Sequence, residues 1–341
     1  MMSNVKYCIE TTNDVIVFLF ALQKWTTGVK LRLLSEQHKS TVSYRGIYLM
    51  TKYKRRFGDR YDGRRLRSLD PFYRIVPFIM RYRSDSQNYF EEKIDIGHTE
   101  AYLRKRRKSS GIKISMLHVM IAAMVRTIAL RPALNRFIAG QNIYARNEIL
   151  VSLAIKKEMK VDSPETTVKF KFEPTDTLSE IAEKINSQIE ENKVLDAQNN
   201  TDKAARLFML CPGLLVKLLV FIIRVLDYFG LMPKALHRAS PFHTSFFITD
   251  LGSIGIHPIY HHLYDFGTTS VFVAFGIKTK EKVIDSNNEI KEKRFITLKV
   301  VTDERIVDGH YYASAFKLYK TLVQNPERLE VHPGDLEQDV D

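Results

Sequence analysis

The stretch FITLKVVTDERIVDGHYYASAFKLYKTLV, residues 295–323, decides the fold class. Its first seven residues, Phe295–Val301, are mostly apolar and β-branched, which predicts a strand. Residues 311–323 have a helix-like pattern, and the following segment Asn325–Leu329, which contains a proline, closes that helix. Between the strand and the helix lies the hexapeptide ERIVDG, Glu304–Gly309. A strand, a short polar loop and a helix in this order indicate an α/β protein.

Predicted helices and strands also alternate along the sequence upstream of this stretch. Lys113–Leu130 is a mostly apolar stretch that predicts a helix ended by Pro132. Thr177–Glu180 has the spacing of a capping box, and the apolar residues that follow it lie on one helical face: Leu178, Ile181, Ile185 and Ile189. Further strands are predicted at Phe137–Tyr144, Ile149–Ile155, Val168–Phe172, Ser245–Ile248 and Val271–Phe275. The sequence has neither a Gly-x-Gly-x-x-Gly motif nor a P-loop, so this is not the pattern of a classical nucleotide-binding fold.

The composition is that of a globular protein with an anionic partner. Apolar residues make up 45% of the 341 positions and aromatic residues 11%, enough for a substantial core. The formal net charge of +13 favours an anionic binding partner, which could be nucleic acid, a membrane surface or a phosphorylated small molecule. The charge alone does not choose among them. Cys8 and Cys211 match no metal or disulfide spacing, which fits a reducing compartment.

No stretch has the roughly 18–20 apolar residues that a membrane span requires. Val15–Leu22 is a short apolar run, but acidic residues precede it where a signal peptide carries positive charge. We therefore expect a cytoplasmic protein.

The chain divides into three parts by composition. Residues 1–49 look unlike the rest, and we interpret them as an N-terminal extension outside the core; the alternative is an N-terminal helix packed on the domain. Residues 50–330 would form the main domain, and residues 331–341 an acidic tail. Deleting residues 1–49 tests this, because a large loss of melting temperature would contradict the extension hypothesis.

Four stretches in the same order resemble the catalytic domain of the 2-oxo acid dehydrogenase acyltransferases and the related chloramphenicol acetyltransferase. The stretches are Glu100–Arg126, the segment Pro132–Asn135, the segment Phe247–Gly252 and the hexapeptide Glu304–Gly309. The last of these is similar to the family's His-x-x-x-Asp-Gly motif, with Glu304 in place of the histidine. The resemblance covers roughly residues 65–330 and implies a two-layer α/β sandwich, a mixed sheet with helices on one side.

This resemblance also implies a site and an assembly. In the family, acyl-coenzyme A and an acceptor meet in a channel between subunits of a homotrimer. Carried over by position, Glu304 replaces the base, Thr249 replaces the serine whose hydroxyl helps to hold the oxyanion, Asp308 organises the loop, and Gly309 is kept. The chain shows no lipoyl domain, so it is not expected to be an ordinary dehydrogenase-complex component.

The carboxylate at position 304 changes the energetics of proton removal. A thiol with a pKa of about 8.5 lies about 2 units above imidazole and about 4 units above an ordinary glutamate, an extra cost of roughly 3 kcal/mol. Burial in an apolar channel can raise a carboxylate pKa by a few units and close that gap. Arg305 should affect Glu304 little, because neighbouring residues of an extended segment face opposite sides.

The histidines offer other readings. His310 follows the motif directly and is an alternative catalytic group or a helix-capping residue. His257, His261 and His262 include an i, i+4 pair, but Pro258 interrupts the stretch and no Glu or Cys completes a ligand set. We therefore expect no metal site.

Two basic runs, Lys52–Arg67 and Arg104–Lys108, are candidates for binding coenzyme A phosphates or an acidic partner. The alternative for the second run is a solvated helix face. No recognition motif accompanies the charge, so nucleic-acid binding is not expected.

An apolar insertion occupies roughly residues 200–240. Within it, Leu214–Leu226 carries only Lys217 and Arg224 as polar residues, seven positions apart on one narrow face. A helix of this kind could lie on a membrane surface, line an acyl-chain channel, or be buried in the core or the trimer contact, and the last is the favoured interpretation.

The sequence thus predicts a coenzyme A-dependent acyltransferase acting on a small thiol, alcohol or amine. The rival interpretation is a catalytically silent homologue that binds an acyl-coenzyme A or a protein partner.

Overall fold

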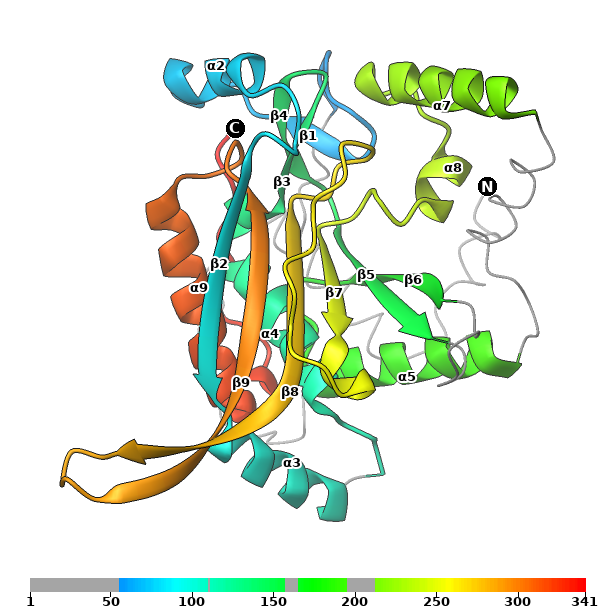
Figure 1. The fold of residues 1–341 in the computed structure, drawn as a ribbon. Coiled ribbons are helices and arrows are strands. Elements are labelled where there is room, and N and C mark those ends of the chain that lie inside the picture. Colours follow the sequence, from blue (N-terminus) through cyan, green and yellow to red (C-terminus); the bar gives the residue numbers. More distant parts are fainter. Residues whose placement is uncertain (1–54, 110, 157–164, 195–211) are drawn as a thin grey trace, which may run out of the picture. The chain divides into compact units, whose positions relative to one another are not determined.

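The computed structural model describes residues 55–109, 111–156, 165–194 and 212–341 (Figure 1). The predictions made for residues 1–49, for Val15–Leu22 and for both cysteines lie outside these ranges. No helix within the described ranges is both long enough and apolar enough to span a bilayer.

A six-stranded sheet forms one layer. Its strands, in spatial order, are β2 (Gln87–Asp95), β9 (Ile290–Asp303), β8 (Val271–Ile284), β7 (Phe246–Asp250), β5 (Ile149–Lys156) and β6 (Glu165–Phe172). β7 runs parallel to both β5 and β8, whereas the other neighbours are antiparallel, so the sheet is mixed. The strands predicted at Val168–Phe172, Ser245–Ile248 and Phe295–Val301 are confirmed.

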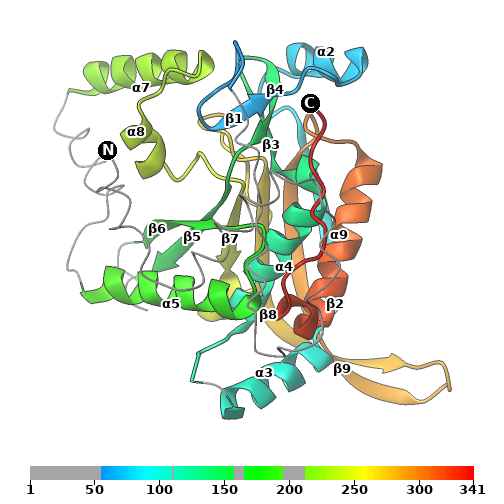
Figure 2. The same cartoon turned by 180° about the vertical axis from the view of Figure 1, so that it is seen from behind.

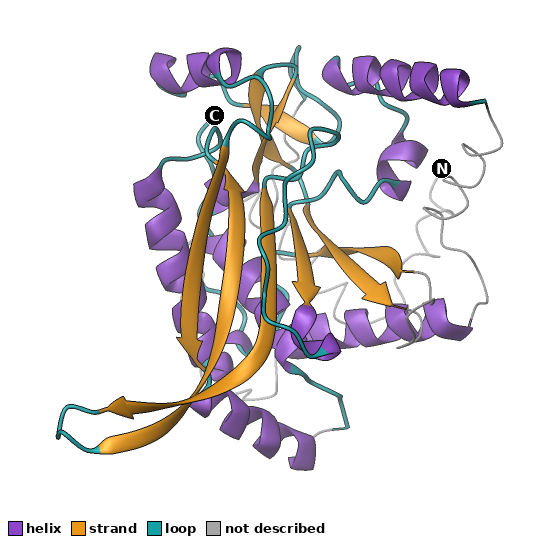
Figure 3. Ribbon diagram, in the orientation of Figure 1, coloured by secondary structure: helices purple, strands orange, loops and turns teal. Residues whose placement is uncertain are grey.

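The second layer consists of helices on one face of this sheet (Figures 2 and 3). They are α4 (Met116–Leu130), α5 (Leu178–Val194) and α9 (Gly309–Gln324), and α3 (Gly97–Ser109) follows β2. The capping box of α5 is present, since the Thr177 amide donates to the Glu180 carboxylate over 2.8 Å. α4 begins at Met116, three residues later than predicted, because the Ser115 amide donates to His118 Nδ1 over 2.9 Å and so starts the helix there.

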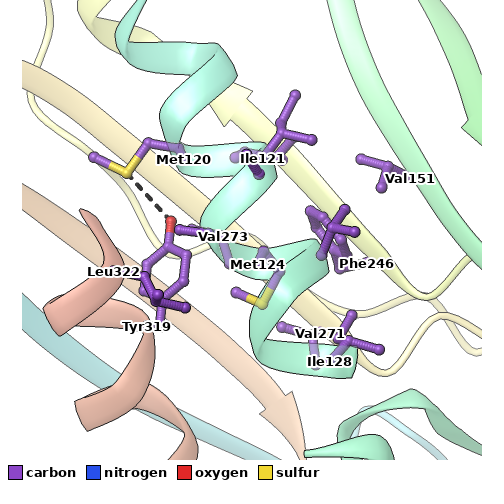
Figure 4. Close-up of a cluster of buried hydrophobic side chains, with 14 of the residues drawn as sticks. Met120, Ile121, Met124, Ile128, Val151, Phe246, Val271, Val273, Tyr319 and Leu322 are labelled. Carbon is purple, nitrogen blue, oxygen red and sulfur yellow. Dashed lines mark hydrogen bonds between the residues drawn. The ribbon is translucent and has the colours of Figure 1, made fainter. Parts of the chain in front are cut away.

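α4 is the centre of the core. Figure 4 shows its side chains between those of the sheet, such as Val151 and Val273, and those of α9. Met120, which is fully buried, accepts a hydrogen bond from the Tyr319 hydroxyl of α9 over 3.2 Å. Because this helix is enclosed on both sides, its near-continuous apolar sequence follows from its position.

A small antiparallel sheet joins β1 (Gly63–Arg65), β4 (Asn142–Arg146) and β3 (Arg136–Ala139). The single strand predicted over Phe137–Tyr144 was wrong, because the chain reverses at Gly140 and Gln141. Both residues have positive φ, +53° and +56°, as a two-residue hairpin turn with the right-handed strand twist requires.

β8 and β9 continue beyond the core as a long hairpin, both strands having 14 residues (Figure 1). The sequence predicted only Val271–Phe275 and Phe295–Val301, which are the buried halves. The outer halves are rich in charged residues and contain no buried side chain, so they lack the apolar pattern by which a core strand is recognised.

The apolar insertion forms α7 (Gly213–Tyr228) and the short α8 (Lys234–Ala239). Every residue of α7 is described, and none of them is buried. The interpretation of this helix as part of the core was therefore wrong for the single chain. A further helix that the sequence did not predict, α2 (Pro71–Ile79), is likewise mostly exposed.

Residues 331–341, predicted as an acidic tail, make specific contacts with basic residues. Asp339 accepts two hydrogen bonds from the Arg136 guanidinium, 2.8 and 2.5 Å long. Asp341 pairs with Arg56 at 2.6 Å. The tail is therefore held against the small sheet and its flanking loops.

Candidate active site

Asp303 and Arg305, the two neighbours of Glu304 in the chain, form a buried ion pair that shapes the loop after β9. Arg305 contacts Asp303 through two hydrogen bonds of 2.8 Å, and its guanidinium also donates to the carbonyl oxygens of Met80 and Arg81. Asp303 lies within 3.3 Å of a second buried guanidinium, that of Arg83. These contacts hold both flanking side chains inside the protein.

Glu304 itself is exposed. Its amide donates to the Ser86 carbonyl over 2.8 Å, which fixes the backbone, while the side chain faces solvent. The prediction that Glu304 and Arg305 face opposite sides is confirmed. No part of the same chain that the structure describes buries the Glu304 side chain.

Asp308 and Gly309 form the start of α9. Asp308 is the N-cap residue: one carboxylate oxygen accepts from the Tyr311 amide over 2.7 Å and the other from the Tyr73 hydroxyl of α2 over 3.0 Å. These two hydrogen bonds, that of Tyr311 first, lower the pKa of Asp308. A Cβ added at Gly309 would meet nothing within 4 Å. Asp308 thus caps α9 and links it to α2, whereas the space beside Gly309 is open.

Thr249 lies in a different place. It is buried near the end of β7, opposite Ala274 of β8, which in turn pairs with Lys299 of β9. Glu304 follows Lys299 by five positions, about 16 Å further along the strands at ~3.3 Å per residue. The two predicted catalytic residues therefore lie at different levels of the sheet and do not form one site within a single chain.

The turn after Thr249 is tightly packed. Asp250 caps the 3-10 turn Leu251–Ile254 by accepting from the Ser253 amide over 3.0 Å. A Cβ on Gly252 would come within 2.6 Å of the Gly276 carbonyl oxygen, so only glycine fits there. This close approach explains the glycine of the segment Phe247–Gly252.

His310 and His261, two of the histidines singled out from the sequence, lie in different parts of the fold. His310 is exposed at the beginning of α9, and His261 stacks on Phe272 with ring centroids 4.4 Å apart. Partial burial lowers the pKa of His261. Across the described ranges, no group of three or more His, Cys, Asp or Glu side chains is placed to hold a metal ion.

The basic runs are partly neutralised by carboxylates. In the first run, Arg60 and Arg67 pair with Asp62 and Asp59 at 2.8 and 2.9 Å. In the second run, Arg106 contacts Glu330 at 2.9 Å, and the other four residues of the segment are exposed on α3. That run accordingly has the surroundings of a solvated helix face.

A buried charge network at the base of the insertion escaped the sequence analysis. Arg60 contacts Asp62 at 2.8 Å and Asp227, at the end of α7, at 2.7 Å. His243 lies 3.3 Å from Asp227, and its other ring nitrogen is 2.7 Å from the Ser240 hydroxyl. No local pattern points to this network, because 167 positions separate Arg60 from Asp227.

Burial perturbs the titration of this network. Desolvation lowers the pKa of His243 to about 4, although its hydrogen bond to the Asp227 carboxylate opposes this shift. Burial also lowers the pKa of Lys169 to about 7, with the charge of Arg146 acting in the same direction. The Ser240–His243–Asp227 series has the composition of a hydrolase triad, but His243 is completely buried. We therefore assign the network to anchoring the insertion, not to catalysis.

The mixed sheet with helices on one face confirms the predicted two-layer α/β fold, which is the fold of dihydrolipoamide acetyltransferase cores. Residues 234–331 match the family described as 2-oxoacid dehydrogenases acyltransferase (catalytic domain). The resemblance drawn from the four motifs is thereby confirmed for the part of the chain that carries the last two. A sequence comparison with curated proteins gives no match.

Solved structures support the fold across most of the chain. A probable dihydrolipoamide acetyltransferase from Listeria monocytogenes 4b F2365 is 15% identical, with a TM-score of 0.51 over 80% of this chain and 97% of the other. The dihydrolipoamide acetyltransferase (E2p) of Azotobacter vinelandii is 13% identical, with a TM-score of 0.51 over 77% and 93%. The cubic core of a pyruvate dehydrogenase multienzyme complex is 14% identical, with a TM-score of 0.51 over 75% and 87%.

Proposed function

We propose that this protein transfers an acyl group from acyl-coenzyme A to a small thiol, alcohol or amine, in a site between two subunits. Glu304 of one subunit acts as the general base and Thr249 of the next donates to the oxyanion. The observation that carries this proposal is the separation of these residues along the sheet, about 16 Å at the usual rise per residue. A second copy can complete the site that one chain leaves divided.

The chemistry follows from these two groups. The Glu304 carboxylate takes the proton from the acceptor while the acceptor heteroatom attacks the thioester carbonyl carbon. The carbonyl oxygen becomes an oxyanion and accepts a hydrogen bond from the Thr249 hydroxyl. When the tetrahedral intermediate collapses, the carbon–sulfur bond breaks, and the departing thiolate receives the proton held by Glu304. Atoms and charge balance without a metal.

A subunit interface would also change the environment of the base. Glu304 is exposed in the single chain, so the covering surface of a neighbour would desolvate it. Desolvation raises a carboxylate pKa and makes the group a stronger base. The buried Asp303–Arg305 pair keeps the loop in place while this happens.

The test is the release of free coenzyme A from a panel of acyl-coenzyme A esters with thiol, alcohol and amine acceptors. Acceptor-dependent release by the wild type that is lost in Glu304→Gln and in Thr249→Val supports the proposal. Mixing the two inactive variants then tests the subunit arrangement. Random assembly of equal amounts should restore about one quarter of the sites, because only these pair an intact Glu304 with an intact Thr249. No recovery would place both groups in one chain and contradict the shared site.

The second candidate is a silent homologue that binds an acyl-coenzyme A without turning it over. The carboxylate at the base position favours it, since glutamate is ordinarily the weaker base. Saturable binding of an acyl-coenzyme A by calorimetry, together with no release in any acceptor series, would establish this alternative.

A further inference from the structure

The exposed helices α2 and α7 share an unusual composition. α7 presents Leu214, Leu218 and Phe221 to solvent, the last with 63% of its surface exposed. α2 presents Phe72, Phe78 and Ile79, and Phe72 is 70% exposed. We call the exposed side chains of these two helices the α2–α7 surface. Apolar residues at such density are unusual on a surface that meets only water.

The two helices lie at the same end of the molecule. Figures 1 and 2, related by a half turn about the vertical axis, both show α2 and α7 at the end opposite the β8–β9 hairpin. Together the two helices offer a broader exposed apolar surface than either helix alone. A single small pocket on a partner protein could not accommodate both.

α7 is held in this position by its C-terminal end. The side-chain carboxylate and the backbone carbonyl oxygen of Asp227 both accept hydrogen bonds from the buried Arg60 guanidinium. The Tyr228 carbonyl oxygen would lie 2.5 Å from a Cβ at Gly140, so the helix end rests directly on the β3–β4 turn. These polar contacts occupy the single acidic residue of α7 and leave its apolar side chains exposed.

The charge of the surface selects the partner. α2 and α7 carry Arg74, Lys217 and Arg224, all of them exposed, and the single acidic residue between them is Asp227 in its ion pair. The same surface of a second copy would bring the same three cations against these, whereas an anionic bilayer supplies the opposite charge. Apolar helices with lysine and arginine on the polar side are typical of helices that lie in the lipid headgroup region.

From this arrangement we propose that the α2–α7 surface binds the surface of an anionic lipid bilayer, with both helices lying in the headgroup region. This inference does not depend on the proposed acyl transfer. It assigns a role to α7, the long helix of the apolar insertion.

The experiment is flotation of the full chain with vesicles of phosphatidylcholine alone or mixed with phosphatidylglycerol. The protein should float with the mixed vesicles, and less so as salt is raised. Phe221→Gln combined with Phe78→Gln should abolish most of the flotation. Ile284→Gln with Ile290→Gln is the matched control, because these residues are 69% and 71% exposed at the opposite hairpin; this variant should float like the wild type.

A charge variant supplies a second, independent test. Lys217→Glu with Arg224→Glu should weaken binding to mixed vesicles at least about fivefold, since each basic residue contributes near an anionic surface. Failure of the wild type to float, or flotation of both α7 variants at wild-type levels, would overturn the proposal. Loss of subunit assembly in the α7 variants without wild-type flotation would instead make this surface a contact between copies. Circular dichroism melts confirm that each variant is folded.

Discussion

The Arg305 guanidinium donates two hydrogen bonds of 2.8 Å to the carboxylate of Asp303, two residues earlier. Glu304 lies between the two residues of this buried pair, and its side chain faces solvent. Both partners are nearly inaccessible to solvent. The backbone of the candidate catalytic loop is thus fixed by residues on either side of the base.

Replacing Arg305 by Met should therefore destabilise the protein by about 3 kcal/mol, because a buried carboxylate loses its main partner. Arg83, which lies 3.3 Å from Asp303, still partly compensates the buried carboxylate. The loss of stability should therefore be smaller than for a carboxylate left with no partner at all. Urea unfolding measures the effect. The double variant Arg305→Met with Asp303→Leu should recover part of the stability, since it leaves no unpaired carboxylate. An equal or larger loss in the double variant would show that the pair acts through something other than its charges.

Glu304→His should raise the rate of acyl transfer to a thiol about tenfold or more, since imidazole is the better matched base near neutral pH. The measurement is kcat/KM for coenzyme A release with the acceptor found for the wild type. His310→Ala is the control, and its rate should be unchanged because this exposed side chain lies outside the proposed chemistry. A rate in Glu304→His no higher than in Glu304→Gln would contradict the role of position 304.

Asp308→Ala should lower the free energy of unfolding by about 1 kcal/mol or more, because it removes the N-cap of α9. It also removes the acceptor for the Tyr73 hydroxyl. Tyr73→Phe loses only that second hydrogen bond, so its melting temperature should fall less. If the two variants melted alike, the cap would not be the stabilising contact.

The stability of the protein should fall as the pH is lowered from about 6.5 towards 4. His243 has a pKa lowered to about 4 in the folded protein, so the unfolded chain binds a proton in this range and the folded protein does not. The loss can reach about 1.4 kcal/mol per pH unit for one group. Asp227 faces the ring and has a pKa of about 2, reached because His243 and Arg60 oppose the effect of burial; its own contribution is lost only at lower pH.

Urea unfolding at pH 7, 6 and 5 measures this dependence. His243→Gln should flatten it, although His237, whose pKa is also lowered by burial, retains a part. An identical slope in the wild type and His243→Gln would show that the group responsible lies elsewhere.

The order of strand, loop and helix over residues 295–323 could be predicted from the sequence because each signal is local. Strand and helix periodicity depend on residues that are neighbours in the chain, and the capping box at Thr177 and Glu180 depends on two residues three positions apart. Glu304 and Arg305 were also expected to face opposite sides, but they lie in the turn after β9, where the buried Asp303–Arg305 pair, and not strand alternation, leaves Glu304 exposed. The hairpin at Gly140 also had a local signal, a glycine in the middle of the run, but the continuous apolar pattern on both sides of it hid the turn.

The rest was decided by contacts between distant parts of the chain. Strand order in the sheet is not sequence order, so the positions of Thr249 and Glu304 became known only when β7, β8 and β9 were placed side by side. The network of Arg60, Asp227 and His243 is assembled from remote segments for the same reason. The exposure of α7 was also beyond the sequence, because a helix that is apolar around most of its circumference suits a buried site and a lipid surface equally well. The sequence by itself determined the elements and the acyltransferase-like pattern, whereas the tertiary structure decided which side chains meet and which face solvent.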